Sequence, residues 1–326
     1  MSDWRYKLAE HRGTLLAALV FVIMFAAYVG NHSAGFSANV VQTAANKGVL
    51  LALLAVAQTF VVLTSGIDLS VGAMFILANC LASWIVLGSP LMTALGVVGV
   101  LLTGLACGAA NGAVVIFGRL QPIVATIASG AIYFGIALAL RPNPGGDVNS
   151  DLADALTGQL RGGIPASLAA LVGVVLVIWL PFRRSALGRA VYAVGSSEVA
   201  AYMSGVKTDR AKFAAYTLSG LFSAMGGLML AFFTYSGEAS SANAATYTLN
   251  SIAAVVLGGV SLFGGTGSAV GAIFGALIFR TINDLLFVFD LDPLWQPLFL
   301  GLVLLISVCI GSVRLLRVRN RLDLFG

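Results

Sequence analysis

Long apolar runs, separated by short polar or glycine-rich segments, occupy most of this chain. Most of the runs approach the roughly 20 residues that a helix needs to cross the hydrocarbon core of a bilayer. The pattern therefore predicts an all-α, polytopic membrane protein with about ten transmembrane helices. We place these helices near residues 14–30, 48–64, 70–87, 91–118, 121–140, 164–182, 213–236, 251–263, 269–289 and 294–312.

Two runs and two polar segments depart from the simple pattern. The run at 251–263 is short for a span, and we expect a tilted half-helix that stops at the glycine-rich turn after it. The run at 91–118 is long, and a break near Asn111-Gly112 is expected. We interpret 141–163 as an external surface element and 237–250 as an external loop, neither of them large enough to form a separate domain.

Composition narrows the class of protein further. Of 326 residues, 59% are hydrophobic and 10% are charged, whereas soluble domains carry about 25% charged residues, so soluble and disordered classes are excluded. The three cysteines, Cys80, Cys107 and Cys309, lie inside apolar runs, which favours packing over disulfides. His11 and His32 are far apart, so we expect no metal site, no cofactor and no enzymatic activity.

Basic residues are distributed unevenly between the two sides of the predicted bundle. Fourteen of the 18 Lys and Arg residues fall at the N-terminus, at Arg119, in 183–212 and in the tail 314–321. Three fall on the opposite side and one, Arg280, lies within a run. Because cytoplasmic loops are enriched in basic residues, both termini and the 183–212 loop are predicted to be cytoplasmic, within one membrane domain over 1–326.

The first motif is the turn after the second run, with Gly66, Asp68, Ser70 and Gly72. Asp68 or Ser70 can cap the helix that follows, because a side-chain oxygen there satisfies free backbone N–H groups. The segment is either a structural turn, or a turn that contacts a cytoplasmic partner or lines an inner gate.

The second motif lies in the basic loop, between Gly188 and Val206. Ser196 or Ser197 can cap a short helix, Glu198 then lies in its first turn, and Gly205 ends it. The predicted cytoplasmic helix is either a solvated connector or a docking helix for a soluble partner.

Two glycine patterns complete the motifs. Glycine recurs every fourth residue in two triplets, which are Gly104, Gly108 and Gly112, and Gly267, Gly271 and Gly275. Each triplet predicts close packing of helices or, alternatively, a glycine stripe beside a solute pathway. Val61–Gly66 also resembles Val255–Gly259, at an offset of 194 residues. In both places a turn and a small-residue span follow, which indicates either an internal repeat of parallel sense or a chance similarity between two Val/Gly-rich segments.

Four segments together resemble a known family over nearly the whole chain. They are Gly66–Gly72; Tyr192–Gly195 with Glu198, Ala200-Ala201 and Ser204-Gly205; Ile252–Gly259 with Ser261–Gly265; and Gln121–Thr126. The chain resembles a permease subunit of the ribose/xylose/arabinose/galactose class of bacterial ABC importers, with the branched-chain amino acid permeases as more distant relatives. The family commonly has acidic residues where this chain has Thr248 and Asn250, so the solute does not follow from the resemblance.

The resemblance implies partners in a bacterial inner membrane. Such permeases pair with an identical or different permease, bind two cytoplasmic ATPase subunits and receive solute from a periplasmic binding protein. The chain itself lacks the Gly-Lys-Ser/Thr of a phosphate-binding loop, which agrees with a separate ATPase, and we expect no nucleic-acid partner. The residues expected to couple to the ATPase are Gly195, Ser196, Glu198, Ala200, Ala201 and Gly205.

Neutral sugars need hydrogen-bonding side chains and aromatic contacts along their route. Candidates at membrane depth, each of which could equally satisfy a neighbouring helix, are Gln58, Asn79, Asn111, Thr126, Tyr133, Phe134 and Ser219. Arg280 and Asp284 are four residues apart and are expected to pair within one helix. The alternatives are an ABC permease for a nucleoside, polyol, autoinducer sugar or amino acid and, with less support, an ion-coupled secondary transporter.

Overall fold

The backbone is helical throughout most of the part of the chain that the computed structural model describes, which is residues 12–295, 298–299, 301–302 and 305. Within that part, seven helical segments are long and apolar enough to cross a bilayer. They are α2 (Arg12–Asn31), α3 (Ala38–Val62), α5 (Pro90–Ile116), α6 (Pro122–Leu140), the composite helix Ala166–Arg184, α12 (Thr208–Thr234) and α14 (Ala269–Val288). The all-α, polytopic prediction is confirmed.

Two further helices in the bundle are shorter. α4 (Val71–Ile85) has 15 residues and α13 (Ser241–Leu257) has 17. The predicted run at 294–312 lies largely outside the described residues, which include a 3₁₀ turn, η2 (Pro293–Trp295), at its start. The count of ten spans therefore stays a prediction.

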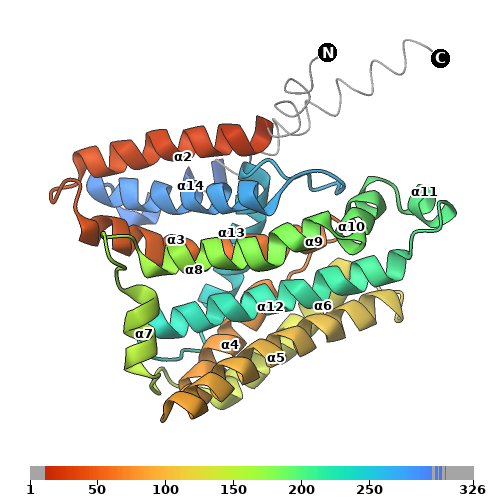
Figure 1. Cartoon of the computed structure of the whole chain (residues 1–326), viewed down its shortest axis with the longest axis horizontal. Coiled ribbons are helices and arrows are strands. Elements are labelled where there is room, and N and C mark those ends of the chain that lie inside the picture. The colour runs from red at the N-terminus through yellow and green to blue at the C-terminus, as the bar shows by residue number, and fades with distance from the viewer. Residues whose placement is uncertain (1–11, 296–297, 300, 303–304, 306–326) are drawn as a thin grey trace.

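The centre of the bundle is α3, which is buried along nearly its whole length. It begins earlier than the predicted 48–64, because the Ser37 hydroxyl accepts a hydrogen bond from the Val40 amide (3.3 Å) and starts the helix there. α2 and α14 lie side by side along one side of the bundle, and α5 and α6 form the other (Figure 1). An apolar helix buried on all sides in this way holds its neighbours in one unit.

The composite helix contains a local change of winding. α8 (Ala166–Val174) continues through a π-helical turn, η1 (Val175–Trp179), into α9 (Leu180–Arg184). Pro181 explains the turn, because a proline inside a helix lacks the N–H donor and its ring crowds the carbonyl four residues before it. Trp179 is buried, and its ring meets Phe60 of α3 at a centroid distance of 5.3 Å.

Both glycine patterns serve close helix packing. A Cβ atom at Gly108 would lie 2.3 Å from the Tyr216 carbonyl oxygen of α12, and one at Gly104 would lie 2.5 Å from that of Gly220. A Cβ atom at Gly275 would lie 2.0 Å from the Ala254 carbonyl oxygen of α13. The packing interpretation is confirmed, because these helices approach more closely than any side chain would permit.

The sequence predictions about the limits of two helices are wrong. α5 runs unbroken through Asn111-Gly112, because the Asn111 amide hydrogen-bonds a side chain of another segment instead of competing for its own backbone. α13 begins at Ser241, inside the predicted external loop at 237–250, because the Ser240 hydroxyl accepts from the Asn243 amide (3.2 Å). The same helix ends at Leu257, before the predicted limit at 263.

The two ends of the bundle carry different short helices. α7 (Ser150–Thr157), within the predicted surface element at 141–163, lies at one end, and α10 (Ala186–Ser196) with α11 (Glu198–Met203) lies at the other (Figure 1). The Thr157 carbonyl oxygen accepts from Asn46 (2.8 Å) and ties α7 to α3. The α10–α11 end carries the basic loop predicted over 183–212.

Two smaller predictions concern single side chains. Arg280 and Asp284 form the expected ion pair within α14, with Nη2 and Oδ1 2.9 Å apart. Cys80 and Cys107 are free thiols, in agreement with the packing role expected of them. The third cysteine, Cys309, lies outside the described residues.

Candidate coupling surface and buried motif

The short helix predicted in the basic loop is present as α11. The Ser197 hydroxyl accepts from the Ala200 amide (3.3 Å), and Glu198 occupies the first turn, where a negative charge is favoured. Gly205 follows the helix with φ of 78°, a conformation that side chains disfavour, so the chain can turn into α12 there. Of the two serines considered as caps, the structure selects Ser197.

An exposed apolar surface covers α11. Val199, Tyr202 and Met203 are 66%, 73% and 82% exposed, and they follow one another at the spacing of a single helix face. Only Ala201 of this helix is buried, whereas Ala200 is exposed. Exposed apolar patches of this kind occur at sites that contact another protein or the membrane surface.

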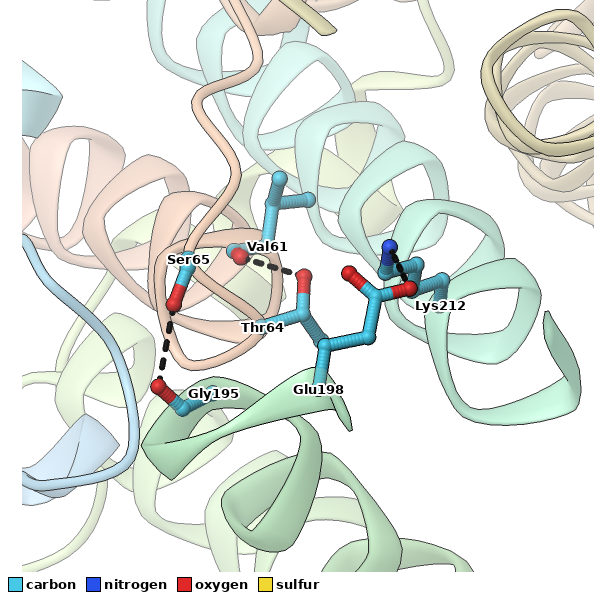
Figure 2. A network of polar contacts seen from close by, with 6 residues as sticks. All are labelled: Val61, Thr64, Ser65, Gly195, Glu198 and Lys212. Carbon is cyan, nitrogen blue, oxygen red and sulfur yellow. Dashed lines mark hydrogen bonds and ion pairs between the residues drawn. The ribbon is translucent and has the colours of Figure 1, made fainter. Parts of the chain in front are cut away.

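Glu198, which we expected at the partner surface, pairs within the chain. Its carboxylate Oε1 lies 2.5 Å from Nζ of Lys212 in α12 (Figure 2). A cleft of 520 Å³ opens beside this pair, between the start of α12 and the turn after α5. Its charged lining residues are Arg119, Glu198, Asp209 and Lys212. The pair links the first turn of α11 to the start of α12.

The turn before α4 is organised around a buried carboxylate. Asp68 is fully buried, and its Oδ1 accepts from both the amide (2.9 Å) and the hydroxyl (2.6 Å) of Ser70. The Ser219 hydroxyl of α12 donates to Oδ2 (3.2 Å). Ser70 occupies the cap position of α4, but its hydroxyl makes no cap bond. The predicted side-chain cap is therefore replaced by a closed turn between Asp68 and Ser70.

Side chains from α5 and α6 extend this network. Asn111 Nδ2 donates to the Ser70 hydroxyl (2.7 Å), and the Tyr133 hydroxyl lies 3.0 Å from Asn111 Oδ1. The Thr126 hydroxyl accepts from the Leu69 amide (2.9 Å). Two helices on one side of the bundle are therefore tied to the turn before α4.

Gln58 of α3 completes the same network. In the orientation that satisfies both groups, its carboxamide donates to the Asp68 carbonyl (2.9 Å) and accepts from the Asp68 amide (3.3 Å). Five of the seven predicted pathway residues thus meet around one turn: Gln58, Asn111, Thr126, Tyr133 and Ser219. Because their buried polar atoms bond within the chain, this arrangement can hold four helices and the turn in register.

The other two predicted pathway residues lie elsewhere. Asn79 of α4 donates to the Ser236 carbonyl (3.1 Å) and accepts from the Glu238 amide (2.9 Å), far along α4 from Asp68. Phe134 is half-buried and packs against the apolar core.

The glycines of the turn motif face neighbouring segments at close range. A Cβ atom at Gly72 would lie 2.0 Å from the Ala244 carbonyl oxygen of α13, and the Gly72 amide donates to the Thr248 hydroxyl (3.0 Å). A Cβ atom at Gly66 would lie 3.0 Å from the Tyr216 hydroxyl. Thr248, at a position noted as unusual for the family, thus bonds the first turn of α4.

Sequence reasoning missed several residues of this region. The partner of Glu198, Lys212, lies 14 residues away, and no local periodicity indicates such a pair. The exposed face of α11 could have been found, since Val199, Tyr202 and Met203 repeat at helical spacing. Among the described residues, no three His, Cys, Asp or Glu side chains are grouped as metal ligands would be.

Comparison with known proteins adds an independent line of evidence. The family model described as the permease component of the branched-chain amino acid transport system matches residues 40–308. No solved structure matches the chain.

Three curated relatives illustrate the range of the match. The ribose import permease of Bacillus subtilis is 35% identical over 260 residues, covering 78% of this chain and 79% of that protein. The fructose import permease of Rhizobium meliloti is 33% identical over 306 residues, covering 91% and 84%. The autoinducer 2 import system permease of Yersinia pseudotuberculosis is 33% identical over 280 residues, covering 83% and 77%.

Proposed function

The chain belongs to the family of permease components of the branched-chain amino acid transport system, and on this premise we propose that it is the membrane subunit of a bacterial ABC importer for a monosaccharide. In this proposal it spans the inner membrane as one domain and pairs with a second, identical or different, permease. Two ATPase subunits drive it from the cytoplasm, and a periplasmic binding protein delivers the solute.

The observation that carries the proposal is the exposed apolar face of α11. Val199, Tyr202 and Met203 are exposed on a six-residue helix. This helix lies at one end of the bundle (Figure 1). The Glu198–Lys212 pair holds that helix against α12, so force applied to α11 is transferred to a long helix of the bundle. We propose that α11 docks on an ATPase subunit, with Gly195, Ser196, Ala200, Ala201 and Gly205 shaping its approach.

In this proposal the energy for transport comes from ATP hydrolysis on a separate subunit. The sequence has no Gly-Lys-Ser/Thr, so it offers no phosphate-binding loop of its own. The ion pair predicted within a span, Arg280 with Asp284, is closed at 2.9 Å, which favours a structural role over a coupling site for an ion. The proposed orientation, with both termini and the 183–212 loop in the cytoplasm, rests on the distribution of Lys and Arg.

The solute proposed is a monosaccharide. Relatives of this chain import ribose and fructose, and another belongs to an autoinducer 2 import system. A nucleoside, polyol, autoinducer sugar or amino acid is the alternative. For Gln58, Asn111, Thr126, Tyr133 and Ser219, the internal hydrogen bonds support a role in positioning the Asp68 turn more than contact with solute.

Reconstitution tests the proposal directly. The chain, the ATPase and the binding protein encoded with it are placed in proteoliposomes with ATP inside and the binding protein outside. Uptake of labelled ribose or fructose is measured. Uptake that requires both ATP and the ATPase supports the proposal, and equal uptake by the chain alone contradicts it.

Variants of α11 examine the docking surface in the same system. Tyr202→Glu combined with Met203→Glu is expected to abolish copurification of the ATPase, because a charged face cannot enter an apolar groove. Arg210→Ala, an exposed change outside α11, serves as the control. Copurification that survives in the double variant would place the ATPase contact elsewhere on the chain.

A further inference from the structure

Three segments that are distant in the sequence meet near the start of α11: Leu63–Gly66, Gly195-Ser196 and Phe263–Gly265. The Ser65 hydroxyl lies 2.7 Å from the Phe263 carbonyl oxygen and 3.0 Å from that of Gly195, so it contacts both other segments and its single proton can be donated to either carbonyl. Figure 2 shows the contact between Ser65 and Gly195. The Gly265 amide donates to the Leu63 carbonyl (3.1 Å), which joins the first and third segments a second time. We name these three segments the three-way joint.

Glycine makes this approach of backbones possible. A Cβ atom at Gly195 would lie 1.9 Å from the Leu63 carbonyl oxygen and 2.5 Å from the Gly265 amide nitrogen. A Cβ atom at Gly265 would lie 2.4 Å from the Ser196 hydroxyl oxygen. Since real Cβ atoms do not approach other atoms so closely, only glycine lets these segments pack so tightly, and the side-chain groups at the contact are the short hydroxyls of Ser65 and Ser196.

Each segment of the joint leads directly into transmembrane helices or into α11. Leu63 follows α3 and is linked through the Asp68 turn to α4. The Phe263–Gly265 segment connects α13 to α14. Gly195 lies at the end of α10, three residues before Glu198 begins α11. The turn after α3 and the turn after α13 therefore both contribute to the joint.

One further hydrogen bond ties α10 to the segment that connects α13 to α14. The Tyr192 hydroxyl donates to the Gly267 carbonyl (2.7 Å), one residue before the Ser268 cap of α14. α10 and the residues at its end therefore contact the α13–α14 connection at Gly265 and Gly267. They contact the α3–α4 connection at Leu63 and Ser65, so a displacement of α10 would act on both connections.

We propose that the three-way joint moves as one body, so that a displacement of α11 reaches the α3–α4 and α13–α14 pairs together. Gly195 and Ser65 are its positioning residues: they contact no solute, and they set how the motion of α11 is divided between the two helix pairs. The proposal rests on the proposed function, because it describes how a stroke from an ATPase would enter the bundle.

The first test needs no partner. The full chain in lipid nanodiscs is compared with Gly195→Ala by amide hydrogen exchange. Exchange at 63–66 and at 258–267 is expected to rise together by about fivefold or more, the effect of losing about one hydrogen bond. Gly173→Ala is the matched control, because that helical glycine has open space where a Cβ would lie. Faster exchange confined to 195–205 would overturn the joint.

The second test measures how well ATP hydrolysis is coupled to import in the assembled transporter. Solute imported per ATP hydrolysed is expected to fall about tenfold in Gly195→Ala and about fivefold in Ser65→Ala. Ser65→Ala only removes a hydroxyl and adds no atom that could clash. It therefore still tests the proposal if Gly195→Ala does not fold. A wild-type ratio in Ser65→Ala, with wild-type exchange at 258–267, would overturn the proposal. If the wild-type complex imports nothing with ATP, the proposed function fails, and the exchange result still decides whether the joint moves as one body.

Discussion

Nζ of Lys212 lies 2.5 Å from Oε1 of Glu198, and this contact joins the beginning of α12 to the first turn of α11. Both side chains are partly exposed, so the pair contributes at most about 1 kcal/mol to the stability of the chain. Its importance is geometric, because it sets the direction in which the apolar face of α11 is presented.

The pair gives a charge-swap prediction. Glu198→Gln is expected to lower ATP-driven uptake severalfold with little change in the unfolding temperature, because α11 loses its orientation but the core is intact. Exchanging the charges, with Glu198→Lys and Lys212→Glu, is expected to restore uptake. Uptake and thermal unfolding are measured for both. A swapped chain that stays inactive would mean that Glu198 contacts the ATPase itself.

A second prediction concerns the buried carboxylate of Asp68. Asp68→Ala leaves the Ser70 amide and the Ser70 and Ser219 hydroxyls without their acceptor, at a cost of about 3 kcal/mol. The unfolding temperature in detergent is expected to fall by several degrees, and less in Asp68→Asn, which retains one acceptor oxygen. Asp151→Ala, on the exposed surface of α7, is the control. Equal stability of Asp68→Ala and the wild type would contradict the network.

The contact between α4 and α13 gives a third prediction. Gly72→Ala would place a methyl group 2.0 Å from the Ala244 carbonyl oxygen, which neighbouring backbone cannot relieve without separating the helices. We expect a loss of at least about 3 kcal/mol and poor accumulation in the membrane. Gly135→Ala, on an open face of α6, is expected to behave as the wild type. Expression level and thermal unfolding are the measurements, and normal values for Gly72→Ala would refute the close contact.

A fourth prediction concerns pH at the opposite end of the bundle. The Tyr235 hydroxyl donates to the Asp154 carboxylate of α7, and this bond raises the pKa of Tyr235 above its ordinary value near 10. Because the neutral phenol is the donor, the bond is fully present below about pH 10 and is lost as pH rises through the raised pKa.

Spin-label mobility measures this loss. A label on α7 at Asp151→Cys, in a chain whose native cysteines are replaced, is expected to become more mobile as pH rises above about 10. In Tyr235→Phe the label is expected to be mobile at every pH, because the donor is absent. A step of equal size in both chains would show that another group holds α7.

Several elements could be predicted from the sequence because they depend on local physics. Apolar runs of bilayer length indicated the long helices, and the Ser197–Gly205 spacing indicated α11. The i, i+4 spacing likewise gave the Arg280–Asp284 pair. The first half of α13 was not predicted, because polar residues such as Asn243 and Thr246 are typical of a loop. In the structure a serine cap and close packing against α4 stabilise this segment as a helix.

The candidate sites depended more on distant contacts. Gln58 and Ser219 were selected as polar groups at membrane depth, and both are buried, but Asp68 lies 10 and 151 residues from them and the sequence gives no sign that they meet. Ser65 carries no distinguishing signal in the sequence, because a serine in a turn has many local uses. Its bridge to Gly195 and Phe263 exists only once the fold brings three turns together.

The length of α4 has a consequence for the barrier that this bundle presents. Its 15 residues rise about 22 Å, less than the roughly 30 Å of hydrocarbon that a bilayer offers. Polar groups bound each end: the Asp68 turn on one side, and on the other Val86, whose carbonyl accepts from the Asn149 amide. α4 is therefore too short to cross the hydrocarbon by itself, and the buried turns at its two ends complete the crossing with backbone and polar groups that must find their hydrogen-bond partners inside the protein.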